Sequence, residues 1–338
     1  MSFPPFAPAR RLGILAASLA FLAFPAAAQT KPSAPDPAPA PARAPVVLGT
    51  GAVTGLYYPV GGALCRVMND EVGRNGPRCL VEATEGSVEN LTALRAGLLD
   101  FALVQSDWQY QALKGEGRFA AAGPFADLRA VMSLHAETLT ILARPEAGVT
   151  GPEALAGKRV SLGPKGSALR GLAETVLAAA GAGKFAETQD LPSPEAVAAL
   201  CEGRVDVAVF AVGHPNGAIR DAVTDCGAVP VPLAGDAMRK LLAERPWFVT
   251  TRIPARLYPG IDTDIPTVGL IATLVTTAKA DESLVHALVK AVLDEFDTLR
   301  GEHPALEGLQ VDTLANLGRS APLHPGAVAA LKEAGLAP

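Results

Sequence analysis

The sequence predicts an α/β protein of two domains, and three observations indicate this. Short apolar runs that end in Gly or Ser alternate with helical patterns, which is typical of parallel βαβ units. The alternation occurs in two separate series, and 338 residues are enough for two domains of ordinary size. Two long β-type runs, at 128–144 and 268–278, indicate a chain that leaves one domain, builds a second and returns.

The first series contains three pairs of a strand and a helix. Each apolar run is short and ends in small or polar residues, as a buried strand that leads into a helix does. The expected strands are 46–50, 79–84 and 101–106, and the expected helices are 61–72, 87–99 and 107–114.

The second series lies between the two long β-type runs. Its expected strands are 159–164 and 205–212, and its expected helices are 168–180, 194–202 and 218–223. After the second run, apolar residues at helical spacing predict one long helix over 281–300 that docks on the first domain. We therefore assign 45–138 and 268–338 to domain I and 139–267 to domain II.

The first 28 residues are typical of an export signal. Arg10 and Arg11 precede an apolar stretch at 12–24, and small residues end at Ala28. A membrane anchor is the alternative, but this stretch is shorter than the ~20 residues that span a bilayer, and no Cys stands at the cleavage point to carry lipid. We expect cleavage near Ala28, a periplasmic mature protein, and an extended Ala/Pro tether over 29–44 outside the fold.

The charge distribution excludes one class of partner. The formal net charge is −5, and no block of Lys or Arg occurs after the first dozen residues. The chain therefore lacks the basic patch by which proteins bind nucleic acids or anionic membranes. We expect no nucleic-acid partner.

The four cysteines, Cys65, Cys79, Cys201 and Cys226, are an even number in an exported chain, where disulfides are stable. Three pairings are possible. Two local bridges, 65–79 and 201–226, are the simplest. Zinc is the competing interpretation, but no C-x-x-C or H-x-x-x-H spacing occurs, so we expect no metal site.

Five segments, in this order along the chain, together resemble the TAXI family of extracytoplasmic solute receptors, which serve tripartite ATP-independent periplasmic (TRAP) transporters. The segments are LGTGAVTGLYYPVGG (48–62), EATEGSVENLTALRAGLLDFALVQSD (82–107), GSALR (166–170), AVGHPNG (211–217) and SAPLHPGA (320–327). The resemblance covers residues 46–336. It implies a two-domain type II periplasmic binding protein fold with a ligand cleft between the domains.

The same resemblance implies a function. Such a receptor captures a small organic anion, for example glutamate or another dicarboxylate, as a monomer without a cofactor. It delivers that anion to a TRAP membrane permease with fused small and large membrane subunits. The residues support an anion receptor on their own account, because helix N-termini beyond the carboxyl ends of parallel strands offer free amides and a partial positive charge.

The first loop carries the densest set of candidate ligand residues. Small residues would allow close backbone approach, hydroxyls would donate hydrogen bonds, and aromatic rings would form a wall. The candidates are Thr50, Gly51, Thr54, Tyr57 and Tyr58. The alternative is a structural turn with both tyrosines packed at the domain edge. The G-x-G-x-x-x-G spacing misses the dinucleotide fingerprint by one residue, so NAD binding is not expected.

Two further loops of domain I carry polar candidates. Ser87 precedes a helical pattern, so it is either a helix N-cap or a ligand contact. Gln105 and Ser106 end the third strand at the same sheet edge, and Ser106 either caps the next helix or reaches the cleft.

In domain II, Ser167 is the expected N-cap of a helix whose first turn contains Arg170. An Arg there opposes the helix dipole, so we expect it to clamp a ligand carboxylate; a salt bridge is the alternative. His214 follows the apolar strand 205–212 and either contacts ligand or holds its loop. His324 precedes Pro325 and is expected to start a helix.

No enzyme signature competes with a receptor: G-x-S-x-G and P-loop motifs are absent, and the acidic residues lack metal-loop spacing. An exported hydrolase in which Ser106 meets His214 across the cleft is one alternative. A receptor that presents its ligand to a membrane sensor is another.

Overall fold

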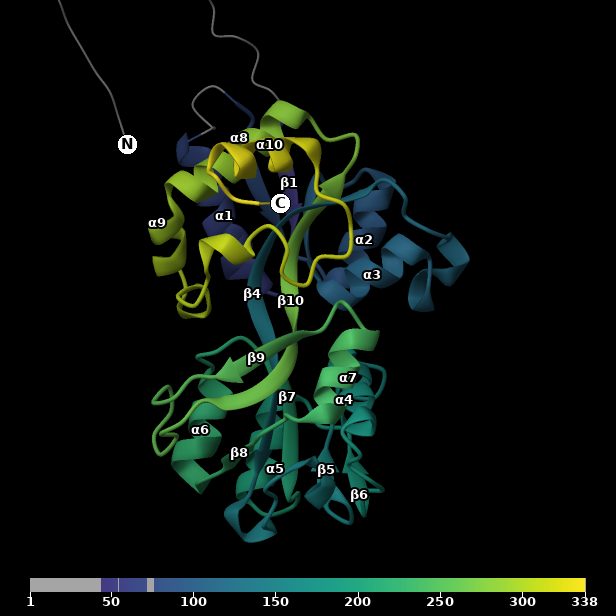
Figure 1. Ribbon diagram of the computed structural model, residues 1–338, viewed down its shortest axis with the longest axis vertical. Coiled ribbons are helices and arrows are strands. Elements are labelled where there is room, and N and C mark those ends of the chain that lie inside the picture. Colours follow the sequence, from purple (N-terminus) through teal and green to yellow (C-terminus); the bar gives the residue numbers. More distant parts are fainter. Residues whose placement is uncertain (1–43, 54, 72–75, 338) are drawn as a thin grey trace, which may run out of the picture. The chain divides into compact units, whose positions relative to one another are not determined.

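Two long strands, β4 (Leu128–Ala143) and β10 (Ile265–Thr277), run through the middle of the structure and connect two lobes (Figure 1). The computed structural model describes residues 44–53, 55–71 and 76–337. The expected export signal, nearly all of the tether and Thr54 lie outside the described residues. Within the described part, no helix combines the length and apolar character that a membrane span requires.

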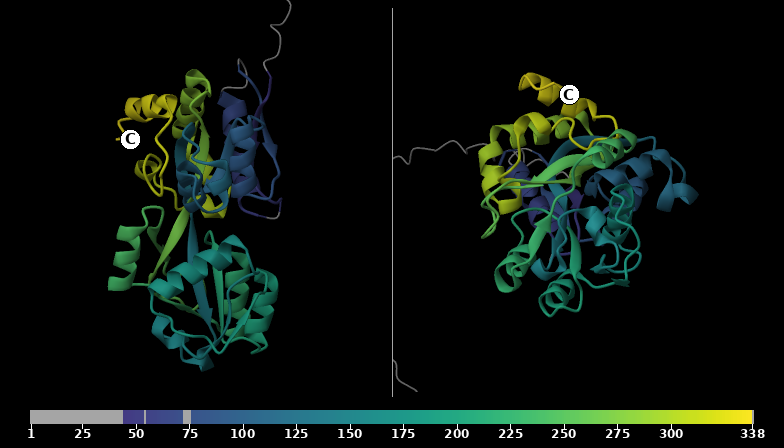
Figure 2. Two further views of the ribbon diagram at one scale, coloured as in Figure 1. Left: turned by 90° about the vertical axis from the view of Figure 1, so that its right-hand side faces the viewer. Right: turned by 60° about the horizontal axis from the view of Figure 1, so that its bottom comes forward.

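The first lobe has three parallel strands with helices on both faces (Figure 2). Alternate residues of the third strand face opposite cores: Phe101 and Leu103 pack under α1, α8 and α10, while Ala102 and Val104 pack under α2 and α3. The elements are β1 (Val46–Gly49), α1 (Tyr57–Glu71), β2 (Cys79–Glu82), α2 (Ser87–Ala96), β3 (Phe101–Gln105), α3 (Ser106–Lys114), α8 (Glu282–Asp294), α9 (Phe296–Gly301) and α10 (Pro325–Glu333).

The second lobe repeats this arrangement. Residues 207 and 209 of its central strand face the core under α4 and α7, and residues 208 and 210 face the core under α5 and α6. The elements are β5 (Arg159–Ser161), α4 (Ala168–Ala179), β6 (Glu187–Gln189), α5 (Ser193–Cys201), β7 (Val207–Val212), α6 (Gly217–Cys226), β8 (Val229–Val231), α7 (Asp236–Glu244) and β9 (Val249–Ile253).

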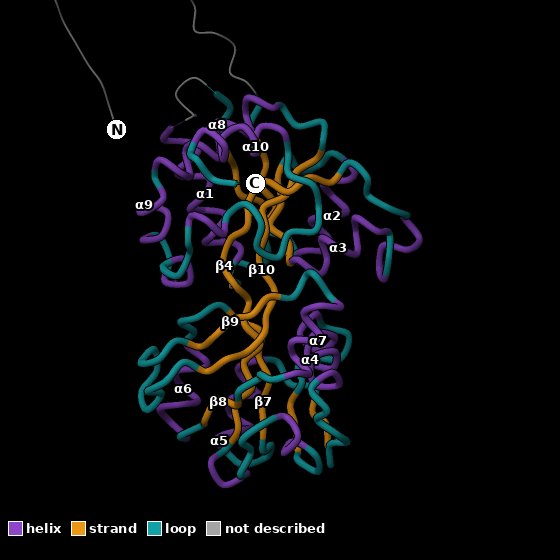
Figure 3. The backbone as a smooth tube through the Cα atoms, in the orientation of Figure 1, coloured by secondary structure: helices purple, strands orange, loops and turns teal. Residues whose placement is uncertain are grey.

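All these strands belong to one mixed sheet in the order β2-β1-β3-β10-β4-β7-β5-β6, with β8 paired to β4 and β9 to β10. β4 and β10 are antiparallel and pass unbroken between the lobes (Figure 3). Gly269 pairs with Thr138 there, and a Cβ at 269 would lie 2.5 Å from the Glu137 carbonyl oxygen, so this close approach requires glycine. Contacts hold the described residues together as one unit, and the division into domains I and II stays a prediction.

The largest differences from the predicted helices concern α1 and the helix expected over 281–300, and α7 was not predicted at all. α1 begins at Tyr57 rather than at residue 61, because Pro59 falls in the first turn, where its missing N–H breaks no helical hydrogen bond. The single helix expected over 281–300 is interrupted at Glu295, whose φ of −104° and ψ of 29° are not helical. The interruption starts α9 in a new direction, with Leu299 buried in the same core as the predicted docking face of α8.

Both disulfides that the sequence suggests are present, Cys65–Cys79 between α1 and β2 and Cys201–Cys226 between the ends of α5 and α6. Each bridge lies within one lobe.

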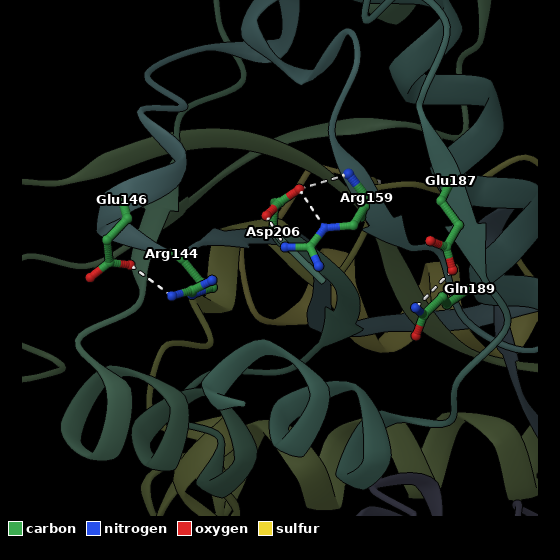
Figure 4. A network of polar contacts seen from close by, with 6 residues as sticks. All are labelled: Arg144, Glu146, Arg159, Glu187, Gln189 and Asp206. Carbon is green, nitrogen blue, oxygen red and sulfur yellow. Dashed lines mark hydrogen bonds and ion pairs between the residues drawn. The ribbon is translucent and has the colours of Figure 1, made fainter. Parts of the chain in front are cut away.

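An ion-pair network fixes the amino ends of the second-lobe strands (Figure 4). Asp206 accepts hydrogen bonds from the backbone N and from Nη2 of Arg159, at 2.9 and 2.6 Å. Ligands bind at the carboxyl ends of parallel strands. This network therefore lies at the opposite end of the sheet from a ligand site.

Candidate functional site

Two cavities lie side by side at the carboxyl ends of the strands, and both are lined by Tyr57 and Glu137. We call them cavity A, of about 670 Å³, and cavity B, of about 590 Å³. The residues that line cavity A include Gly51, Gly55, His135, Ser193, Gly213, Asn216, Gly217 and His303. Those that line cavity B include Glu85, Gly86, Ser87, Glu89, Gln105, Trp108, Arg118, Gly166 and Ala168.

The N-termini of three helices meet at cavity A. Tyr57 begins α1, Ser193 begins α5 and Gly217 begins α6, and all three line the cavity. The first amides of a helix lack intrahelical acceptors and carry a partial positive charge. Cavity A therefore offers anion-binding capacity from both lobes.

Glu137 lies in the wall between the two cavities. The Tyr57 hydroxyl donates to its Oε1 at 2.6 Å, and Gln105 Nε2 donates to its Oε2. Desolvation by burial raises the pKa of the Glu137 carboxyl, against the effect of these two hydrogen bonds. Burial also raises the pKa of nearby Asp107 to about 7, with Glu137 as a further cause.

His135 precedes Glu137 by two residues on β4 and lines cavity A. The residue is 3% exposed, and neither ring nitrogen has a hydrogen-bond partner among the described residues. Its ring meets that of Tyr57 edge-on, at 6.0 Å between centroids. Burial lowers the pKa of His135 to about 3, so the ring is neutral at physiological pH and presents one donor and one acceptor.

Comparison with known proteins gives the family. The chain matches the NMT1-like family over residues 48–335. It is an NMT1-like protein. Three solved solute-binding proteins are similar in structure: a TctC protein from Polaromonas (16% identity, 78% of this chain and 88% of that one, TM-score 0.50), MatC from Rhodopseudomonas palustris with bound malate (17%, 78% and 88%, 0.48) and the aliphatic sulphonate binding protein SsuA from Escherichia coli (15%, 80% and 80%, 0.47). At these identities the similarity to the TctC structure shows the α/β fold.

The first-loop candidates of this NMT1-like chain separate in the structure. Gly51 and Tyr57 line cavity A. Thr50 is fully buried, and its Oγ1 donates to the Glu82 carbonyl at 2.7 Å. Its hydroxyl therefore has a structural role. Tyr58, 37% exposed, lines neither cavity.

The serines of the first lobe are placed by partners from other elements. The prediction of Ser87 as an N-cap is wrong: Gly86 holds that position, and Ser87 Oγ accepts from the Gln105 amide at 3.0 Å, while both Ser87 and Gln105 line cavity B. Ser106 is fully buried. Its Oγ donates to the Trp247 carbonyl at 2.8 Å and accepts from the Ile271 amide at 3.1 Å, so it caps no helix and reaches neither cavity.

Ser167 is the N-cap of α4, as predicted, and accepts from the Arg170 amide at 3.2 Å. The Arg170 guanidinium pairs with Glu174 and with Asp190, and it lines neither cavity. These two acids offset the unfavourable position of Arg170 in the helix dipole, which the sequence had explained by a ligand carboxylate.

His214 holds the loop between β7 and α6. The Tyr258 hydroxyl oxygen accepts from the Asn216 amide at 2.8 Å and forms a hydrogen bond with His214 Nδ1 at 2.6 Å, and His214 Nε2 forms one with Thr140 Oγ1 at 2.9 Å. Burial lowers the pKa of His214 to about 4. The ring faces a smaller cavity of about 270 Å³ rather than A or B, while the loop it fixes carries Gly213, Asn216 and Gly217 into cavity A.

The Ser106–His214 pair of the hydrolase alternative does not form. Ser106 and His214 each bond to other groups, and no hydrogen bond joins them. In the described part of the chain, no three His, Cys, Asp or Glu side chains gather as metal ligands would. His324 caps α10 through Nδ1, the structural role that the sequence predicts.

Sequence reasoning missed His135, Glu137, Ser193, Asn216 and Arg118. The first two are polar residues inside a long apolar β-run, and that interruption was an available signal. Arg118 lies over the ring of Trp108, at 5.9 Å from its centroid, and its Nη2 donates to the Gly166 carbonyl of the other lobe at 3.2 Å. Nothing in the local pattern marks Arg118 as an interlobe contact.

Proposed function

We propose that this NMT1-like protein is an extracytoplasmic solute-binding protein of the TAXI type, which captures a small organic acid and delivers it to a TRAP membrane permease. The observation that carries the proposal is cavity A, where helix N-termini from both lobes meet. Its volume of about 670 Å³ is in the range of small-molecule sites. Helix N-termini favour an anion, such as a carboxylate, over neutral or cationic groups.

The two unbroken strands supply the hinge that such a receptor needs. β4 carries His135 and Glu137 of the cavity wall, and β4 and β10 both enter the two lobes. A ligand that contacts both walls of cavity A stabilises the closed form over the open one by its differential contacts. Rotation about the crossings, near Leu139 and Leu270, would close the cavity.

We expect a smaller radius of gyration in small-angle scattering when the protein is saturated with its ligand, identified by mass spectrometry of the solute retained through purification. An unchanged scattering profile at saturation would contradict the proposal. Hydrolysis of a bound ester to its acid and alcohol during incubation would favour the hydrolase instead.

Export and delivery have their own tests. The mature chain purified from the periplasm should begin at or near Gln29. Reconstitution with a fused TRAP permease encoded beside it should give ligand uptake that depends on the receptor; signalling without uptake would favour the sensor alternative.

A further inference from the structure

A third cavity lies beside the strands that join the lobes. It is the cavity of about 270 Å³ that the His214 ring faces, and we call it cavity C. Ala136 and Thr138 line cavity C, whereas Glu137, between them on β4, lines cavity A. Because successive side chains of a strand point to opposite faces, the two cavities open on opposite faces of β4. Cavity C is therefore distinct from the cavity to which we assign the transported solute.

Both lobes contribute to cavity C. Leu309 and Leu317, in the segment between α9 and α10, belong to its wall from the first lobe. Thr251 and Arg252 belong to its wall from the second lobe, on β9, which pairs with β10 at the joint (Figure 1). A molecule in cavity C would therefore contact both lobes and the strands that join them.

β4 has a bulge where it passes this cavity. Ile271 of β10 pairs with Ala136 of β4. Two residues further along β10, Thr273 pairs with Ser133, which is three residues away on β4, so β4 carries one extra residue over this interval. Such a bulge interrupts the regular alternation and re-aims a side chain. His135 lies in the bulge, and its ring lines cavity C as well as cavity A.

Two buried polar groups that line cavity C lack a hydrogen-bond partner among the described residues. They are the His135 ring, at both nitrogens, and Thr251 Oγ1. A buried polar group without a partner destabilises the fold, so each needs a ligand or water to offset this cost. Thr251 lines neither cavity A nor cavity B, so the partner of its hydroxyl has to come from cavity C.

The charges around cavity C disfavour an ion as its occupant. Arg252 is the one side chain with a formal charge among the described residues that line it, and its Nη1 pairs with Asp264 Oδ2 at 3.2 Å. Burial lowers the pKa of His135 to about 3 and that of His214 to about 4, so both rings are neutral at physiological pH. An anion would find no uncompensated cation here and a cation no carboxylate, and burying an unpaired charge is costly.

The unpaired groups match a hydroxyl compound. A neutral imidazole presents one donor and one acceptor, and a threonine hydroxyl can both donate and accept. A ligand hydroxyl has the same two capacities, so it can pair with either group. The rest of the lining is largely aliphatic, with Leu134, Ile271 and Leu309 among its residues, and suits a short carbon chain. The volume lies just below the range of about 300 to 1,000 Å³ that is usual for small-molecule sites, which indicates a molecule of only a few carbon atoms.

We propose that cavity C is a second binding site, which takes a small uncharged polyol whose hydroxyl groups pair with His135 and Thr251 and whose carbon chain lies against the aliphatic lining. The inference goes beyond the proposed function and does not depend on it, because no step uses the solute of cavity A. The polyol contacts both lobes and the joint, so it stabilises the arrangement of the lobes in which all these contacts are made.

The test follows the imidazole nitrogen resonances by NMR at neutral pH while glycerol is added to the dialysed protein. The His135 resonances should shift and reach saturation, because the ring gains a hydrogen-bond partner. His324, which caps α10 and lines none of the three cavities, is the internal control and should not shift. A His135 shift that grows in proportion to glycerol without saturating overturns the inference, since cavity C would then hold water only.

Two variants assign the shift to a cavity. Thr251→Val keeps the shape of the side chain and removes its hydroxyl, so the affinity for glycerol should fall about fivefold. This variant removes a buried group that has no protein partner, so it should fold without loss of stability. Ser193→Trp fills cavity A instead and should leave the affinity for glycerol within twofold of the wild type.

Thr188→Val, at an exposed site on β6 that lines none of the three cavities, is the matched control and should bind glycerol as the wild type does. If Ser193→Trp abolishes the His135 shift and Thr251→Val retains it, glycerol lies in cavity A and the inference is wrong.

The class of ligand is tested with charged analogues of the same size. Glycerate and 2-amino-1,3-propanediol place an anion and a cation on the three-carbon skeleton of glycerol. The titrations use the Ser193→Trp protein, so that binding of an acid in cavity A does not contribute. Each analogue should bind at least about tenfold more weakly than glycerol, because its charge has no partner in cavity C. An analogue that binds as tightly as glycerol overturns the assignment to an uncharged ligand.

Discussion

Cavities A and B share one wall, the Tyr57–Glu137 pair, yet they differ in what faces that wall. Cavity A contains a buried, unpartnered His135 and receives three helix N-termini, whereas cavity B contains exposed acids and an arginine that already bonds across the lobes. The charged side chains that only cavity B contains are exposed, so water can satisfy them without a ligand. Groups that are buried and still unpaired are a better guide to a ligand site, because only a ligand or water can satisfy them.

The strongest test of this comparison fills each cavity with the same side chain. Ser193 and Ala168 are each the first residue of a second-lobe helix, and they line cavities A and B respectively. Ser193→Trp should weaken ligand binding by at least 30-fold, about 2 kcal/mol, because the indole takes the ligand's space. Titration calorimetry measures this directly.

Ala168→Trp is the matched variant and should change the affinity less than threefold. Circular dichroism melts of both proteins establish that they are folded. If Ala168→Trp is the one that abolishes binding, cavity B is the ligand site.

A second test uses the unpaired ring of His135. Its folded-state pKa, about 3, lies below the ordinary 6.5, so the unfolded chain binds the additional proton between these values. His135 therefore does not lower the free energy of unfolding above pH 6.5. Below pH 6.5 it lowers the free energy of unfolding progressively as the pH falls toward 3. His135→Phe keeps the aromatic contact with Tyr57 and removes this loss, while it weakens ligand binding.

We expect the unfolding free energy of His135→Phe, minus that of the wild type, to rise as the pH falls through this window, by at most about 1.4 kcal/mol per pH unit. Other titrating groups cancel in the difference. Urea melts at several pH values measure it. A difference independent of pH would mean that His135 is hydrated and free to ionise.

The smallest effects are expected from two arginines. Arg170→Ala loses ion pairs with partly exposed acids and should lower stability by about 1 kcal/mol or less, with affinity within threefold of the wild type. Arg118→Ala loses the hydrogen bond to Gly166 in the other lobe and should weaken binding by about fivefold, since a net hydrogen bond contributes about 1 kcal/mol. A large loss of affinity in Arg170→Ala, with little change in Arg118→Ala, would instead identify Arg170 as the carboxylate anchor.

The sequence was sufficient for features that depend on local pattern. Alternating strands and helices, the two crossings, the Ser167 and His324 caps and the local disulfide pairs were all predicted and are present. The outcome for Arg170 shows where local pattern ends. The helix-dipole argument correctly required a nearby anion, but it could not distinguish a ligand from Asp190, twenty residues along the chain.

Side chains whose partners come from distant segments were the ones misassigned. Ser106 precedes a helical pattern, as a capping residue does. The carbonyl of Trp247 and the amide of Ile271 nevertheless hold it in the core. Glu137 gave no helical or turn signal at all, because its role depends on which face of β4 lines the cavity. That register is fixed by pairing with β10 and β7, which a local pattern does not show.

The placement of the two disulfides has a mechanical consequence. Each covalent bridge stiffens one lobe, and neither crosses the pair of strands between them. Oxidation of the four cysteines therefore stiffens each lobe without a covalent link across the pair of strands that connects them. A reductant should therefore lower the melting temperature of the lobes, yet leave the motion of one lobe relative to the other as it was, because neither disulfide spans β4 and β10.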